Sequence, residues 1–140
     1  MVLRNSIRLH KNLRDATLNN LQIKSIDDLR DQVDTELNVI INARDMPLYR
    51  LMSYHMGWVD KHGNSDLPIG IRRDHGVLCL IVFLAFGGNL NTVLPAAAAV
   101  ELVYNFCQIH DDVQSGNPKR DNRDSVWWIW GPAQAINAGD

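Results

Sequence analysis

Residues 91–116 read NTVLPAAAAVELVYNFCQIHDDVQSG, and this segment carries the strongest structural signal in the chain. Its four consecutive alanines have the highest helix propensity and allow neighbouring helices to approach closely. We expect Asn91 or Thr92 to cap a long helix that has Pro95 in its first turn and ends near Val113.

The charge pattern around this helix is unusual. Between His75 and His110 the only formally charged residue is Glu101, so this part of the chain is expected to lie in a core. Two carboxylates, Asp111 and Asp112, follow immediately. The C-terminal end of a helix is unfavourable for negative charges because of the helix dipole, and adjacent carboxylates raise each other's pKa. This arrangement therefore needs a stabilising partner or a functional reason.

A divalent cation would provide such a reason. Mg²⁺ takes oxygen ligands and often binds through a few carboxylates together with substrate phosphates. Ser115 lies four residues after Asp111 on the same helical face, where its hydroxyl could add a direct or water-mediated contact. Considered alone, adjacent aspartates before a Gly-Asn-Pro turn, such as Asp111 and Asp112, are usually solvated side chains.

The rest of the chain also carries helical signals. Ser25 with Asp28 resembles a capping box, and the apolar residues that follow recur at helical spacing. No segment alternates convincingly with period two, so the predicted fold class is all-α. Further helices are expected over about residues 25–44, from Pro47 through Leu51 and His55, and over about 72–86 up to Gly87-Gly88. After a polar loop that ends at Asp124, we expect a short helix capped by Ser125 and a last helix from near Gln134.

Composition limits the class of protein. The chain has 140 residues, 46% hydrophobic and 21% charged, with a formal net charge of −2. These proportions indicate one globular domain, and the charge disfavours a nucleic-acid partner. The longest apolar run, Val77–Phe86, is too short to span a bilayer, and the N-terminus lacks the apolar segment of a signal peptide. Cys79 and Cys107 lie in apolar runs, which favours free thiols and a cytoplasmic location.

The first 24 residues form a basic lead. Arg4, Arg8, Lys11 and Arg14 recur at near-helical spacing. Such a segment can touch a membrane surface, but a solvated helix or a frayed terminus is the favoured interpretation. We therefore divide the chain into an N-terminal basic lead, residues 1–24, and a helical domain, residues 25–140.

Several segments resemble one enzyme family. Glu101–Gly116 resembles the first aspartate-rich region of the trans-type polyprenyl diphosphate synthases, and the resemblance continues through Arg120 and through Val126–Asp140. Upstream, Pro47–Trp58 looks like the family's early helix, and Ile71–Gly88 looks like its basic substrate motif followed by a buried helix and a Gly-Gly turn. The resemblance covers residues 25–140 and places three segments in the family's order.

The resemblance implies an antiparallel helical bundle, the first half of the isoprenoid synthase fold, and a prenyltransferase activity. Such enzymes hold an allylic diphosphate through Mg²⁺ on two aspartate-rich motifs, and isopentenyl diphosphate attacks the allylic cation. The resemblance implies a metal site at Asp111, Asp112 and Ser115. It implies diphosphate binding by Arg72, Arg73, His75 and Arg120, and a cavity wall at Phe106 and Cys107 that limits the product length.

The sequence also departs from the family. Ser115 stands where the first motif has a third aspartate, and Asp121 replaces the second of two arginines. His75 replaces a third basic residue and is mostly neutral near pH 7 unless a bound phosphate raises its pKa. The 140 residues contain neither the second aspartate-rich motif nor the lysines that accompany it in the family.

Three hypotheses fit the sequence. The first is the N-terminal half of a prenyl synthase, either one member of a two-chain enzyme or a truncated product. The second is a non-catalytic subunit that modulates a complete synthase, and the third is half of a class I terpene synthase. Each leads us to expect a protein partner or a homo-oligomer. His55 is expected to be a packed histidine. The cluster of Trp127, Trp128 and Trp130 is expected to have a packing role or to form an exposed patch.

Overall fold

The computed structural model describes residues 25–43, 46–65 and 72–140, so the predicted basic lead lies outside the described residues. The described residues are mainly helical, which confirms the predicted all-α class. The helices are α2 (Ile26–Ile41), α3 (Pro47–His55), α4 (Asp74–Ala85), α5 (Leu90–Ser115), α6 (Val126–Trp130) and α7 (Pro132–Gly139), and a small hairpin joins β1 (Lys119–Arg120) to β2 (Arg123–Asp124).

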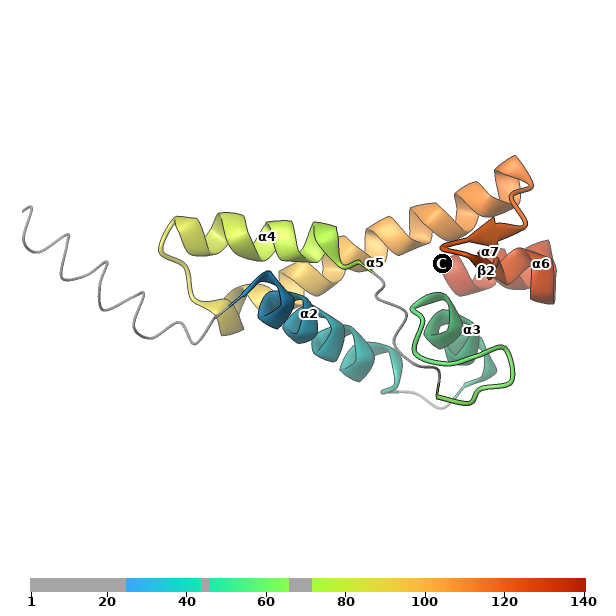
Figure 1. Ribbon diagram of the computed structural model, residues 1–140, viewed down its shortest axis with the longest axis horizontal. Coiled ribbons are helices and arrows are strands. Elements are labelled where there is room, and N and C mark those ends of the chain that lie inside the picture. The colour runs from blue at the N-terminus through green and yellow to red at the C-terminus, as the bar shows by residue number, and fades with distance from the viewer. Residues whose placement is uncertain (1–24, 44–45, 66–71) are drawn as a thin grey trace, which may run out of the picture.

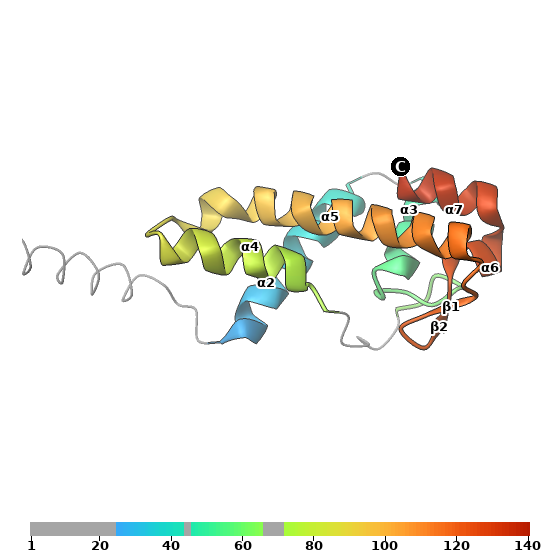
Figure 2. The same ribbon diagram turned by 90° about the horizontal axis from the view of Figure 1, so that it is seen from above.

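Helix α5 runs through the length of the folded part (Figure 1). The helix α4 lies antiparallel along its N-terminal half, and α2 crosses beneath that pair. Helix α7 packs against the C-terminal half of α5, while α3 and α6 pack on α7 (Figure 2). Every other large element is therefore positioned, directly or through one neighbour, by α5.

The buried face of α5 changes character along its length. Its first half contributes Val93, Ala97 and Ala98 to one apolar core, which it shares with α2 and α4. A second apolar core lies near its end and contains Tyr54, Ile109, Val126 and Ala135. Between the two cores α5 buries two polar side chains, Glu101 and Asn105.

Helix α2 begins as the sequence predicted. The Ser25 hydroxyl accepts a hydrogen bond from the Asp28 amide at 3.2 Å, which satisfies one of the free N–H groups of the first turn. Leu29, Val33 and Leu37 recur every four residues and face the first core. The helix ends at Ile41, three residues before the expected end.

The start of α5 corrects a prediction. Asn89 caps the helix, because its side-chain oxygen accepts a hydrogen bond from the Asn91 amide at 3.0 Å. The helix therefore begins before Asn91, and Pro95 lies inside it rather than in its first turn. Proline has no amide hydrogen to donate to the preceding turn, and α5 continues through this gap. The helix ends at Ser115, two residues beyond the expected end, and is followed by Gly116, whose φ of 63° is readily adopted by glycine.

The predicted polar loop before Asp124 contains the β-hairpin. Asp121 and Asn122 form its turn with φ values of 50° and 62°, a conformation that Asp and Asn tolerate. Arg123 anchors the hairpin by donating to the carbonyl oxygens of Tyr54 at 3.0 Å and Val59 at 2.7 Å. Two-residue strands are too short to produce an alternating sequence pattern, so the sequence did not predict them.

The C-terminal helices differ from expectation in detail. Ser125 precedes α6, but its hydroxyl donates to the Asn117 carbonyl at 3.0 Å instead of capping the helix. Helix α7 begins at Pro132, two residues before the expected start. In the part of the chain that the structure describes, α5 alone is long and apolar enough, by length and composition, to cross a membrane. Its contacts with α2, α4 and α7 are those of a core helix in a bundle.

Candidate functional site

The two adjacent carboxylates at the end of α5 point in different directions. The Asp111 side chain is 69% exposed, whereas the Asp112 side chain is 3% exposed. Successive helix residues are rotated by about 100°, so one of two neighbours can face solvent while the other faces the interior. The pair is therefore one surface carboxylate and one buried carboxylate.

Arg120 neutralises the buried carboxylate. From the hairpin, its Nε and Nη2 atoms donate to the two oxygens of Asp112 at 2.8 and 2.7 Å. These hydrogen bonds raise the pKa of Arg120 above its usual value. Nη2 also lies 3.5 Å from an Asp111 oxygen, and Asn117 donates to Asp112 at 3.3 Å. The unfavourable charge at the end of α5 is thus stabilised by a bidentate guanidinium.

The residues proposed for a metal do not by themselves form a Mg²⁺ site. Both oxygens of Asp112 accept hydrogen bonds from Arg120, and the Ser115 hydroxyl donates to the Asp111 carbonyl at 2.7 Å. Asp111 is then the one carboxylate of this pair that faces solvent. Among the described residues, no group of three His, Cys, Asp or Glu side chains is placed to hold a metal ion. Further oxygen ligands would have to come from a substrate or from residues elsewhere.

Asp111 lies in an open groove of about 610 Å³ along α5, which we call the Asp111 groove. Asp111 and Arg120 give the groove a charged end, and aromatic and thiol side chains give it a less polar wall. Its lining includes Tyr104, Phe106, Cys107, Gln108, Asp111 and Arg120. The predicted cavity-wall residues, Phe106 and Cys107, therefore lie in the same groove as Asp111.

The basic segment before α4 divides between surface and interior. Arg72 is 80% exposed and pairs with Asp74 at 2.8 Å. His75 stacks on Tyr104, with ring centroids 3.7 Å apart. His75 itself lines the open groove between α4 and α5, and Tyr104 lines the Asp111 groove. Tyr104 in turn accepts a hydrogen bond from Gln108 at 2.8 Å. The stacking contact with Tyr104 on α5 thus places His75 beside the Asp111 groove.

Arg73 has a structural position. It is 1% exposed, and its Nε donates to Asp34 on α2 at 2.8 Å. Its Nη2 donates to the Met56 carbonyl at 2.8 Å, and the Trp58 indole also donates to Asp34, at 2.9 Å. Arg73 therefore joins α2, the turn after α3 and the start of α4. We leave it out of the diphosphate site, because a buried and paired guanidinium is unavailable to a ligand in the groove.

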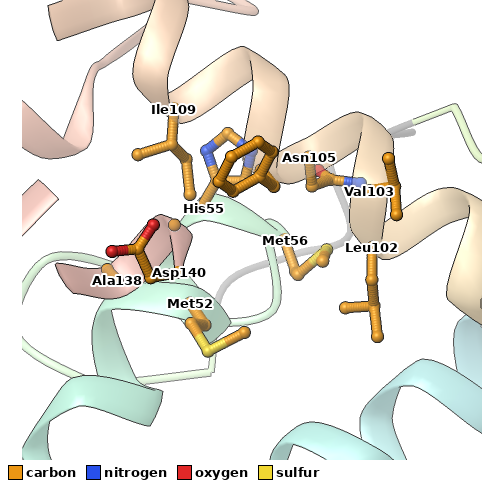
Figure 3. Close-up of a pocket in the computed structure, with 11 residues that line it drawn as sticks. Met52, His55, Met56, Leu102, Val103, Asn105, Ile109, Ala138 and Asp140 are labelled. Atoms are coloured by element: carbon orange, nitrogen blue, oxygen red, sulfur yellow. The ribbon is translucent and has the colours of Figure 1, made fainter. Parts of the chain in front are cut away.

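His55 lies in the interior, as expected for a packed histidine. It lines a cavity of about 310 Å³ between α3, α5 and α7, together with Met52, Met56 and Ile109 (Figure 3). Burial lowers the pKa of His55 to about 4, against the opposing effect of the nearby Asp112 carboxylate. The imidazole is therefore neutral near pH 7, and its Nε2 atom has no hydrogen-bond partner.

Comparison with known proteins identifies the family. Over 107 residues the chain is 37% identical to a (2E,6E)-farnesyl diphosphate synthase of Mycobacterium tuberculosis, covering 74% of the chain and 29% of the relative. A geranylgeranyl diphosphate synthase of the same species is 35% identical over 104 residues, covering 74% and 30%. The solved structure of a polyprenyl synthetase from Streptomyces coelicolor A3(2) superimposes with a TM-score of 0.72 at 33% identity, covering 83% of this chain and 36% of that one.

The chain belongs to the polyprenyl diphosphate synthase family. It spans less than a third of the length of these two curated relatives. A further relative, the chloroplastic small subunit of a heterodimeric geranylgeranyl pyrophosphate synthase from Arabidopsis thaliana, is 35% identical over 78 residues, covering 54% of the chain and 24% of the relative. No family model matches the chain.

In this chain, the structure brings some of the predicted site residues together and separates others. His75, Phe106, Cys107, Asp111 and Arg120 lie in or beside the Asp111 groove. Sequence reasoning did not assign roles to Glu101, Asn105, Tyr104 or Gln108. Glu101 carried the clearest signal, because it is the single formal charge in a long neutral segment.

Proposed function

We propose that this chain forms one side of the active-site cavity of a prenyl diphosphate synthase, and that a second polypeptide segment forms the other side. The reaction would join an allylic diphosphate to isopentenyl diphosphate. The observation that carries this proposal is the Asp111 groove, which combines a charged end at Asp111 and Arg120 with a wall that includes Phe106 and Cys107. A prenyl diphosphate has the same division between a charged head and an apolar tail.

The groove suggests how such a ligand would lie. The diphosphate would sit near Arg120 and His75, with the exposed Arg72 on the same segment as His75. The tail would extend past Phe106 and Cys107. In the condensation the allylic carbon–oxygen bond breaks and diphosphate leaves; the double bond of isopentenyl diphosphate then forms the new carbon–carbon bond, and a proton is lost. The apolar wall would keep water from the allylic cation.

Mg²⁺ remains part of the proposal only for the assembled site. Asp111 supplies one solvent-facing carboxylate, and Asp112 is bound by Arg120. The remaining ligands would come from the substrate diphosphate and from carboxylates outside these residues. We therefore assign the chain by itself no metal-dependent step.

A protein partner is supported by the surface of α4 and α5. Leu78, Val82 and Phe86 on α4, with Val100 and Val103 on α5, are large apolar side chains that the fold leaves exposed. Most of them line an open groove of about 780 Å³ between the two helices. Apolar surface of this extent is typical of an interaction site.

A second candidate function is a non-catalytic subunit that modulates a complete synthase. Asp112 is held by Arg120, and Ser115 bonds to the backbone, so the described residues lack a full carboxylate set. The similarity to a heterodimeric small subunit favours the same candidate. In this case the helix surfaces, rather than Asp111, would carry the function.

The two candidates differ in how they respond to loss of Asp111. The chain would be combined with the part of the M. tuberculosis farnesyl diphosphate synthase that it does not cover, and Mg²⁺-dependent product formation would be measured. For a catalytic half, we expect Asp111→Ala to lower turnover about 100-fold or more, whereas Asp31→Ala on the exposed face of α2 leaves it unchanged. An active complex that tolerates Asp111→Ala would support the subunit role, and a stable complex without turnover would contradict the catalytic role.

A further inference from the structure

The first turn of α4 is capped from a distant part of the chain. Its N-cap residue, Arg73, makes no side-chain cap and instead binds Asp34. The Gly76 amide, in the first turn of α4, donates to the Glu101 carboxylate of α5 at 2.8 Å. A carboxylate at this end of a helix satisfies a free N–H group and interacts favourably with the helix dipole. Glu101 is 1% exposed, so water does not screen the interaction.

The site is shaped for this contact. A Cβ atom at Gly76 would lie 2.8 Å from a Val33 methyl group and 3.0 Å from the Ala97 carbonyl oxygen. The absence of a side chain lets α4 approach α2 and α5 closely. Asn105 fixes the carboxylate by donating from its side-chain amide to the Glu101 carbonyl at 2.7 Å and to the Glu101 carboxylate at 3.4 Å.

The cap lies next to the segment that carries His75. His75 directly precedes Gly76, and its ring stacks on Tyr104. Tyr104 lies three residues after Glu101 on α5 and lines the Asp111 groove. Fixing Gly76 against Glu101 therefore also fixes the segment that carries Arg72 and His75 against the groove.

We propose that Glu101 is a positioning residue that holds Arg72 and His75 beside the Asp111 groove, so that both segments can contact one diphosphate. The positioning is a property of this fold, while its use for diphosphate binding rests on the proposed function above. Glu101 itself contacts no substrate in this proposal and acts through the first turn of α4.

The test uses nuclear magnetic resonance on the 140-residue chain with two variants, Glu101→Gln and Glu101→Asp, and Glu36→Gln on α2 as the control. The first variant removes the charge, and the second keeps the charge but shortens its reach. We expect the Gly76 amide to exchange with solvent about 10-fold faster or more in both variants, which corresponds to the loss of a hydrogen bond to a charged group. The ring-proton shifts that Tyr104 induces in His75 should decrease in both variants and persist in the control.

Titration with inorganic pyrophosphate separates the two proposals. In the wild type, resonances of His75 and of Arg120 should shift together, whereas in Glu101→Gln the response of His75 should fall several-fold and that of Arg120 should persist. No response at Arg120 in the wild type would contradict the proposed function, while the exchange and ring-shift results would still decide the role of Glu101.

Unchanged Gly76 exchange and unchanged His75 ring shifts in a folded variant would overturn the positioning role. If both variants fail to fold, the wild type decides the question. A Gly76 amide that exchanges at the intrinsic rate of an unprotected amide would then overturn the proposed cap, and a protected Gly76 amide would support it.

Discussion

The bidentate pair between Arg120 and Asp112 neutralises a buried carboxylate at the end of α5. Asp112 is buried, and its two oxygens have Arg120 as their main partner. A buried carboxylate whose partner is removed keeps the cost of its desolvation. The pair is therefore a requirement for the fold of this region before it is a feature of any ligand site.

We expect Arg120→Ala to lower the free energy of unfolding by about 2–4 kcal/mol, because it leaves the Asp112 carboxylate buried without its guanidinium. The double variant Arg120→Leu with Asp112→Leu should lose less, since no buried charge remains. Urea unfolding monitored by circular dichroism measures both, with Lys119→Ala as the exposed control. Equal losses in the single and double variants would contradict this explanation.

His55 makes the stability of the fold depend on pH. Its pKa in the folded chain is about 4, below the ordinary value of 6.5, because burial disfavours the charged ring. As the pH falls from 6.5 towards 4, the unfolded chain binds a proton that the folded chain does not, so stability decreases. From pH 7.5 to 5 we expect His55 to account for a loss of about 2 kcal/mol.

Replacing His55 with a residue that does not titrate should remove this contribution. His55→Gln should show a smaller decrease in unfolding free energy between pH 7.5 and 5 than the wild type. His62→Gln, in the exposed loop after α3, should keep the wild-type slope. Chemical denaturation at several pH values measures the difference, and parallel slopes for wild type and His55→Gln would refute the assignment.

At the scale of the elements, the packing of α4 on α2 and α5 depends on a residue without a side chain. A methyl group at Gly76 would contact a Val33 methyl and the Ala97 carbonyl oxygen. A side-chain methyl can move aside, but a backbone oxygen in the middle of α5 cannot move without shifting the helix. The contact with Ala97 should therefore outweigh the gain in helix propensity that alanine brings.

We expect Gly76→Ala to reduce the free energy of unfolding by about 1–3 kcal/mol. Adding Val33→Ala should recover little of this loss, because the carbonyl contact remains and a buried valine is truncated as well. Thermal and urea unfolding of the single and double variants provide the measurement. A stabilised Gly76→Ala variant would contradict the close packing of α4 on α5.

At the scale of the whole molecule, apolar side chains remain uncovered along α4 and α5. Phe86 is 89% exposed, Leu78 is 59% exposed and Val103 is 63% exposed. Large exposed apolar areas promote association in water. The molecule thus presents a surface whose burial by another protein surface would be favourable.

We expect the isolated 140-residue chain to self-associate in sedimentation velocity experiments at micromolar concentration. Leu78→Glu with Phe86→Glu should shift the distribution towards the monomer. Val39→Glu, which changes an apolar residue on α2 that is 64% exposed, should have less effect. A compact monomer at all concentrations would argue against this surface as an interface.

The isolated chain should also lack prenyl transfer. Its described residues supply one solvent-facing carboxylate at the end of α5 and no cluster of three acidic, histidine or cysteine side chains that could hold a metal. Incubation with Mg²⁺, isopentenyl diphosphate and dimethylallyl, geranyl or farnesyl diphosphate should yield no product above a blank. Turnover by the purified chain, free of any host synthase, would contradict the need for a second segment.

The sequence by itself determined the helices, their order and the residues near the site. Capping by Ser25, the start of α3 at Pro47, the Gly-Gly turn and the alanine-rich approach to Asp111 are local features, because helix formation depends on neighbours within about four residues. The predicted helix boundaries differ from the observed ones where another residue caps the helix, as Asn89 does for α5. The hairpin was not predicted because its strands are very short. The resemblance of Glu101–Gly116 to prenyl synthases likewise needed only the order of residues along the chain.

Only the tertiary structure decided what each charged side chain does. Arg73 pairs with Asp34, which lies 39 positions away, and Glu101 caps a helix 25 positions away. Arg120 reaches Asp112 because the hairpin folds back, and His55 loses its charge because three helices enclose it. Burial and pairing depend on residues that packing brings together, and these interactions decide which of two similar side chains is structural and which faces a ligand.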